Sequence, residues 1–233
     1  MNSLILTIVI VSSLSLSITY ILTSFTFIIR MIGAINNINA KSWNLASAVL
    51  LLNSFFIAIS LSMIAFVIDH QPNLNSLLIL FVLSILVVLI GHILMIFKFN
   101  LTSLLIKKIS YLYFKSDLIG NNKINKLNFY QFDPVTFIAW ICFLIGFIFP
   151  SILAVVFNDY RTTLFQLSFI FNSLGTFLTI VITDKKASLL SDKENPSKVE
   201  IKKIVNFLSN VLINRLLATT LVLIVVLILF LLV

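Results

Sequence analysis

Six long runs of the chain carry no Asp, Glu, Lys or Arg, and they constrain the fold more than any other feature. The runs are residues 3–29, 44–68, 76–97, 134–157, 162–183 and 216–233. A helix needs about 20 mostly apolar residues to cross the roughly 30 Å of hydrocarbon in a bilayer. The chain is also 60% hydrophobic, with a mean hydropathy of +1.15, which is outside the range of soluble domains. The sequence therefore predicts an all-α polytopic membrane bundle of six helices, forming a single transmembrane domain over residues 1–233.

Several kinds of chemistry leave marks that this sequence does not carry. It has no HExxH pair, no P-loop and no GxSxG elbow, and its two His and eight acidic residues form no metal-ligand cluster within the runs. The lone Cys142 excludes an intrachain disulfide and a cysteine-based zinc site. We therefore expect neither an enzyme nor a cofactor. The first run is too long for the apolar core of a signal peptide, so it should remain as a spanning helix.

Basic residues gather in alternate loops, and this predicts the orientation. Lys and Arg cluster after the first, third and fifth runs, whereas the loops after the second and fourth runs are short. Basic loops stay on the cytoplasmic side, so both termini are expected on the outer side of the membrane. The net charge of +8 arises largely in these loops, without an aromatic-basic RNA motif. The expected partners are anionic membrane lipids and not nucleic acid, and a homo-oligomer is left open.

Two loop segments have helical patterns of their own. Residues 97–114 separate apolar from polar side chains, as in a helix that lies in the membrane interface. The apolar side consists of Leu101, Leu104, Leu105, Ile109 and Leu112, and the polar side of Lys98, Lys107 and Ser110. Further along, Asn195-Pro196 reads as an N-cap followed by proline at the first helical position, from which one helix could run to Val233.

Polar residues recur at helical spacing along the first and fifth runs. On a helical wheel each set falls within a sector of roughly 80–100°. The first set is Ser12, Ser15, Thr19, Thr23, Thr26 and Arg30, and the second is Arg161, Ser168, Asn172, Gly175, Thr176, Thr179 and Thr183. Small hydroxyl residues often serve only to let membrane helices pack closely. Two stripes that each include an arginine instead favour a polar path through the membrane.

The arginines indicate the chemistry of a cargo. An unpaired charge is prohibitive in bare hydrocarbon, whereas hydroxyls, amides and arginines can replace the lost water. Arginine suits a pyrophosphate because its planar guanidinium makes two charge-assisted hydrogen bonds at once. We expect Arg30 near the cytoplasm, Arg161 near the outer surface and Asp184 at the cytoplasmic end of the second stripe. Arg215 is expected to snorkel at the start of the last span, and His92 to be hydrogen-bonded within the bundle.

Two stretches carry a family resemblance: TSFTFIIRMIGAINNINAKSWNLA at residues 23–46 and RTTLFQLSFIFNSLGTFLTIVITDKKASLLSD at residues 161–192. They resemble the Amj family, the alternate lipid II flippases of bacterial cytoplasmic membranes. The resemblance implies a six-span protein that moves a lipid-linked anionic substrate, the undecaprenyl-pyrophosphate-linked peptidoglycan precursor, to the outer leaflet. It implies substrate-binding roles for Arg30, Arg161, Gln166, Asn172, Gly175 and Asp184. Three further positions are carried over from it, namely Gly33, Ala187 and Asp192.

Three hypotheses follow. The first is a lipid-linked precursor flippase, in which the headgroup crosses through a polar groove while the polyprenyl tail stays in lipid. The second is a small-solute permease, which would need an enclosed midplane site and often a broken helix, for which Pro150 is the only proline deep enough in a span. The third is a non-transporting scaffold that recruits a cell-envelope enzyme through its basic loops.

Overall fold

The computed structural model describes residues 3–36, 38–70, 73–114, 132–191 and 197–233, and every regular element there is helical. Six of the described helical stretches are long and apolar enough to cross a membrane, so the prediction of an all-α polytopic bundle is confirmed. The α-helices are α1 Ser3–Ile35, α2 Asn39–His70, α3 Leu74–Phe97, α4 Phe99–Phe114, α5 Pro134–Val156, α6 Arg161–Leu178, α7 Lys185–Ser191 and α8 Lys198–Leu232. A 3₁₀ turn, η1 Asn158–Tyr160, precedes α6, and a π-helical turn, η2 Thr179–Asp184, follows it.

The single helices α1, α2 and α8 extend well beyond the uncharged runs that predicted them. α1, α2 and α8 have 33, 32 and 35 residues, which is about 50 Å each at 1.5 Å per residue. Their extra length lies at the end of the bundle near α4, where inward-facing side chains such as Ile32, Leu45 and Leu208 form a second apolar core. Charged residues therefore mark where a span ends but not where its helix ends.

The start of α8 corrects one predicted cap. The helix begins at Lys198, where Ser197 and Glu200 form a capping box: each side chain bonds to the backbone N–H of the other residue. The prediction that Asn195-Pro196 caps this helix is wrong in position, because Ser197 supplies the capping hydroxyl. Asn195 and Pro196 themselves lie outside the described residues.

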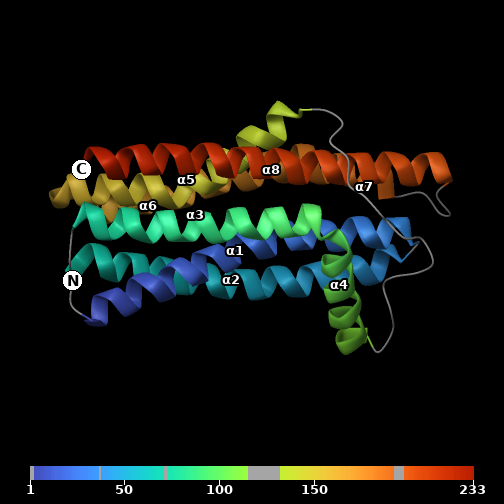
Figure 1. Ribbon diagram of the computed structural model, residues 1–233, viewed down its shortest axis with the longest axis horizontal. Helices are drawn as coiled ribbons and strands as arrows, with labels where there is room; N and C mark the ends of the chain where they lie inside the picture. The colour runs from blue at the N-terminus through green and yellow to red at the C-terminus, as the bar shows by residue number, and fades with distance from the viewer. Residues whose placement is uncertain (1–2, 37, 71–72, 115–131, 192–196) are drawn as a thin grey trace.

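The helices form two hairpins that two further helices hold together. α1 packs along α2 and α5 packs along α6, whereas α3 and α8 pack on each other, α3 against α1 and α8 against α5. Both termini lie at the same end of the bundle (Figure 1), as an even number of spans requires. We call this the terminal end and the opposite end, near α4, the α4 end. α2 and α6 make little contact with each other, so the two hairpins are only loosely joined along that side.

α4 lies across the bundle axis rather than along it (Figure 1). It begins at Phe99, two residues later than predicted. Phe99, Ile106 and Ser110 are buried against the bundle, although Ser110 was predicted on the polar side. The exposed side carries Leu101, Leu104, Leu105 and Leu112. This orientation and these leucines are what a helix in the membrane interface requires.

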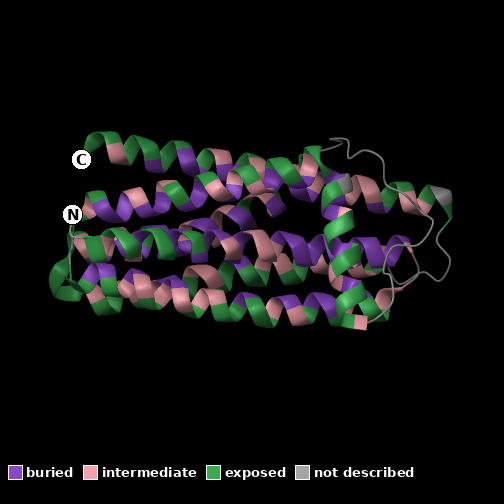
Figure 2. Cartoon of the chain, turned by 60° about the horizontal axis from the view of Figure 1, so that its bottom comes forward, coloured by how far each residue is buried: buried purple, intermediate pink, exposed green. Residues whose placement is uncertain are grey.

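The register between α1 and α3 relates depth in one helix to depth in the other. Buried residues face inward along both helices and exposed residues face outward (Figure 2). The hydroxyls of Ser13 and Ser17 each donate to an α3 carbonyl 67 residues further along the chain, at 3.0 Å. The same offset places Phe97, the last residue of α3, level with Arg30. Arg30 therefore lies where α3 ends and α4 turns away.

Candidate functional site

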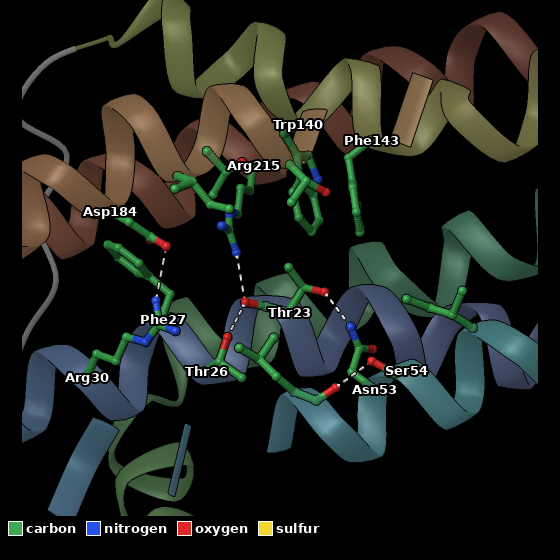
Figure 3. A pocket seen from close by; sticks show the side chains of 15 residues that line it. Thr23, Thr26, Phe27, Arg30, Asn53, Ser54, Trp140, Phe143, Asp184 and Arg215 are labelled. Carbon is green, nitrogen blue, oxygen red and sulfur yellow. Dashed lines mark hydrogen bonds and ion pairs between the residues drawn. The ribbon is translucent and has the colours of Figure 1, made fainter. Parts of the chain in front are cut away.

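A cavity of about 320 Å³ lies between the two hairpins, toward the α4 end (Figure 3). Side chains from α1, α2, α5, α6, η2 and α8 meet around it. Its polar and charged lining consists of Thr23, Thr26, Arg30, Asn53, Ser54, Thr176, Thr179, Asp184 and Arg215. We call it the anion pocket, because its lining includes two arginines and a single aspartate. Both predicted stripes contribute to its wall, so the structure brings the first and fifth spans to one cavity.

Arg215 is the most unusual group in the anion pocket. It is only 3% exposed, and its Nη1 donates to the Thr23 carbonyl at 3.3 Å and to Ser24 Oγ at 2.9 Å. Its guanidinium carbon lies 4.4 Å from the centre of the Trp140 ring. Among the described residues no carboxylate lies within ion-pair distance of it. A buried cation without a carboxylate partner marks a candidate anion-binding position.

The prediction that Arg215 snorkels at a helix end is therefore wrong. α8 begins at Lys198, which places Arg215 about 25 Å further along the helix at 1.5 Å per residue. Its side chain also faces α1 and α5 rather than lipid, as its contacts with Ser24 and Trp140 demonstrate. The uncharged run that follows Arg215 made it look like a boundary residue, but the helix itself continues in both directions.

His92 contacts Arg215 indirectly, through a hydroxyl that both side chains bond, that of Ser24. Its Nε2 lies 2.9 Å from Ser24 Oγ, and its Nδ1 lies 3.0 Å from the Val88 carbonyl. If Nδ1 carries the proton and donates to Val88, Ser24 can donate to Nε2 while it accepts from Arg215. The chain Arg215–Ser24–His92 then leaves each of these atoms satisfied. The prediction that His92 is hydrogen-bonded within the bundle is confirmed.

Arg30 and Asp184 close the anion pocket at the α4 end. Arg30 Nη1 lies 3.1 Å from Asp184 Oδ2, and the two side chains are 11% and 25% exposed. The Arg30 guanidinium carbon also lies 4.1 Å from the Trp43 ring centre. Its Nε is buried and has no hydrogen-bond partner. Arg30 therefore retains an unused donor that an anionic ligand could take.

The α1 stripe divides into a dry half and a cavity-lining half. Toward the terminal end, Ser15 donates to the Phe56 carbonyl of α2 at 3.0 Å, and Ser12 and Thr19 are fully buried. These hydroxyls serve close helix packing. Toward the α4 end the stripe lines the anion pocket with Thr23, Thr26 and Arg30. The same residue pattern thus has two roles along one helix.

Asn53 completes the wall and was missed by sequence reasoning. It is 5% exposed, and its Nδ2 donates to Thr23 Oγ1 at 3.2 Å (Figure 3). Its Oδ1 is buried without a partner. A lone asparagine in an apolar run was the available signal, because an amide in lipid needs a polar neighbour. Trp140, whose ring lies against the Arg215 guanidinium, gave no comparable signal in the sequence.

A second cavity of about 410 Å³ adjoins the anion pocket on the side of the terminal end. Ile57, Phe143, Thr176 and Ile180 line both cavities, so the two lie directly side by side. The remaining lining residues are Leu61, Phe147, Ser168, Phe169, Asn172, Ser173 and Phe177. None of them is charged. We call this cavity the neutral pocket.

The other predicted site residues lie in several places. Gln166 is exposed and lines neither cavity. Arg161 lies at the terminal end, where its Nε is 3.5 Å from Asp69 Oδ1. Gly175 is a packing position, because a Cβ there would lie 2.9 Å from the Phe143 nitrogen of α5. The structure therefore places Arg30, Asn172 and Asp184 at the cavities, and Arg161, Gln166 and Gly175 outside their lining.

The positions carried over only by resemblance do not line the cavities. Gly33 lies under Ser42, where a Cβ would lie 2.0 Å from the Ser42 hydroxyl oxygen. Ala187 is 1% exposed and belongs to the apolar core of the α4 end. Asp192 lies outside the described residues.

The π-helical turn η2 sets the direction of Asp184. π turns inside longer helices often occur at functional sites, because the inserted residue changes which side chains face inward. η2 joins α6 to α7, so Thr179 and Asp184 both face the anion pocket. Within the described residues no three His, Cys, Asp or Glu side chains converge on a possible metal position.

Comparison with known proteins yields no match to a family model, a curated protein or a solved structure.

Proposed function

We propose that the protein moves a lipid-linked, pyrophosphate-bearing precursor of peptidoglycan, of the lipid II type, from the cytoplasmic to the outer leaflet. The observation that carries this proposal is Arg215: a cation 3% exposed inside a membrane bundle, without a carboxylate partner among the described residues, on the wall of a cavity. Burying an unpaired charge is costly, and an anionic headgroup beside it would offset that cost.

The loose contact between α2 and α6 supports a lipid as the cargo. The cavities lie between the two hairpins, and these two helices make little contact with each other. Phe169 and Phe177 of α6 and Ile180 of η2 line the neutral pocket yet remain 56–60% exposed. A tail could stay in the surrounding hydrocarbon on this side while the headgroup occupies the cavities. A soluble solute would have no need of an apolar side opening.

The order of the two arginines supports a stepwise path. In the expected orientation the α4 end faces the cytoplasm, because the basic loops lie there. A headgroup would meet Arg30 first, level with the end of α3. Arg215 bonds to Ser24, which lies six residues before Arg30 on α1, about 9 Å deeper at 1.5 Å per residue. The pyrophosphate would therefore pass from one guanidinium to the next without leaving cationic partners.

Genetic complementation with a direct readout tests the proposal. A bacterium depleted of its own lipid II flippases would express the wild type, Arg215→Gln or Gln166→Leu at matched membrane levels. We expect the wild type and Gln166→Leu to restore growth and outward display of lipid II, and Arg215→Gln to restore neither. Failure of a correctly inserted wild type to display lipid II at the outer surface would overturn the proposal.

A further inference from the structure

We propose that the neutral pocket is a sugar-binding subsite, so that the ligand is a glycosylated lipid phosphate or pyrophosphate whose sugar leads the phosphate through the bundle. This inference rests on the proposed function, since it assigns a second part of the same ligand. It names the residues that would distinguish a sugar-bearing lipid from a lipid phosphate alone.

The lining of the neutral pocket suits a carbohydrate. It combines four uncharged polar residues on α6 with four phenylalanines from α5 and α6 and no charged group. The polar residues are Ser168, Asn172, Ser173 and Thr176, and the aromatic ones are Phe143, Phe147, Phe169 and Phe177. A sugar presents hydroxyls at its edge and C–H groups on its faces, so it can use amides, hydroxyls and ring faces together.

Asn172 is the residue best placed to hydrogen-bond with a sugar. Its Oδ1 is buried without a partner and packs against Gly146, where an added Cβ would lie 2.6 Å away. With Oδ1 turned toward α5, Nδ2 is the amide atom left to face the pocket, where it can donate to a hydroxyl or carbonyl of a ligand. In a membrane an amide of this kind needs such a partner.

A hydrocarbon tail is a less suitable occupant of the neutral pocket than a sugar. Lipid already solvates a tail as well as leucine or phenylalanine side chains do, so burying it in a pocket gains little. A tail would also leave Asn172 without any hydrogen-bond partner, which is unfavourable in an apolar environment. The polar face of α6 therefore favours a hydroxylated occupant.

The order of the pockets fits a headgroup that travels sugar first. The anion pocket includes Asp184 and Arg30 near the α4 end, whereas the neutral pocket extends along α6 to Ser168, toward the terminal end. In a lipid-linked sugar the phosphate lies between the sugar and the tail. With the sugar in the neutral pocket, the phosphate falls beside Arg215 and the tail trails toward the leaflet it left.

A binding measurement on the full-length protein in lipid nanodiscs tests the subsite. Two probes would carry the same short polyprenyl tail and pyrophosphate, one with a linked N-acetylhexosamine and one without. We expect the wild type to bind the sugar-bearing probe at least tenfold more tightly. Asn172→Leu should remove about tenfold of that preference and leave the sugar-free probe within twofold of wild type. Gln166→Leu, the same amide-to-leucine change on the exposed side of α6, should change neither.

Ser173→Phe is a second variant, which fills the neutral pocket from an exposed position and so places little burden on folding. It should weaken binding of the sugar-bearing probe and leave binding of the sugar-free probe unchanged. The inference is overturned if both probes bind the wild type equally, or if Asn172→Leu and Ser173→Phe affect both probes alike. In either case the proposed function would stand if Arg215→Gln still weakened the binding of both probes. Binding of neither probe would overturn the proposed function together with the subsite.

Discussion

The two ends of the cleft between the hairpins are each bridged by an arginine and an aspartate, but the two bridges differ in strength. At the α4 end Arg30 of α1 meets Asp184 of η2 at 3.1 Å, with side chains 11% and 25% exposed. At the terminal end Asp69 of α2 meets Arg161 of α6 at 3.5 Å, with side chains 57% and 38% exposed. The first hairpin supplies the cation at one end and the anion at the other.

The difference in exposure indicates which end holds the hairpins together. Exposed ion pairs contribute about 0–1 kcal/mol and are screened by salt. A shielded pair is different, because removing one partner leaves the other charge uncompensated. The α4 end is therefore the firm connection, and it is also where an anionic headgroup could replace Asp184 as the partner of Arg30. The terminal end should separate more easily.

The largest effect is expected when the charge at the firm end is reversed. Asp184→Arg would place a second cation beside Arg30 at a shielded position, where like charges strongly repel. We expect at least a tenfold loss of lipid II display, together with a lower yield of folded protein. The double variant Arg30→Asp with Asp184→Arg should recover yield, because the pair is restored with opposite polarity. A double variant whose yield stays as low as that of Asp184→Arg would show that the pair does not join the hairpins.

Neutralising the same pair should have a smaller but measurable effect. Asp184→Asn leaves Arg30 without its anion. We expect this to lower the free energy of unfolding by about 2 kcal/mol, less than for a fully buried pair. For a chain of this size that corresponds to a fall of about 4–8 °C in the apparent Tm. Thermal unfolding in detergent would measure it. A Tm within 1 °C of wild type would mean that the two ends do not differ.

His92 should influence the anion pocket only through Arg215. His92→Leu removes the acceptor for Ser24, so the guanidinium of Arg215 would lose its fixed position and the apparent affinity for a pyrophosphate lipid should fall about threefold to tenfold. Turnover at saturating lipid should change much less. His92→Gln, which can still accept from Ser24, should restore most of the affinity. Equal losses in both variants would assign His92 a packing role alone.

The smallest effect is expected at the terminal end. Arg161→Gln or Asp69→Asn removes an exposed pair, so the apparent Tm should fall by less than about 4 °C. In 0.5 M salt the difference from wild type should disappear, since the Debye length is then about 4 Å. Asp184→Asn should keep most of its deficit under the same conditions. A terminal-end variant that is as damaging as Asp184→Asn would contradict the ranking of the two ends.

The sequence by itself determined the membrane architecture. Six uncharged runs sufficed to predict six spanning helices, because a backbone in lipid must satisfy its hydrogen bonds internally and a helix does so locally. The same locality made the 97–114 helix and the face shared by the polar residues of α1 predictable. The helix ends were harder to predict, because α1, α2 and α8 continue as a packed bundle beyond the uncharged runs.

Only the tertiary structure decided which polar residues form the site. Ser15 and Thr23 belong to the same polar stripe on a helical wheel, yet one hydroxyl is packed on α2 and the other lines the anion pocket. Arg215 looked like a boundary residue until its contacts with Ser24 and Trp140 placed it inside the bundle. Helical periodicity reports a direction around one helix, whereas burial and charge pairing depend on which other helix lies in that direction and at what depth.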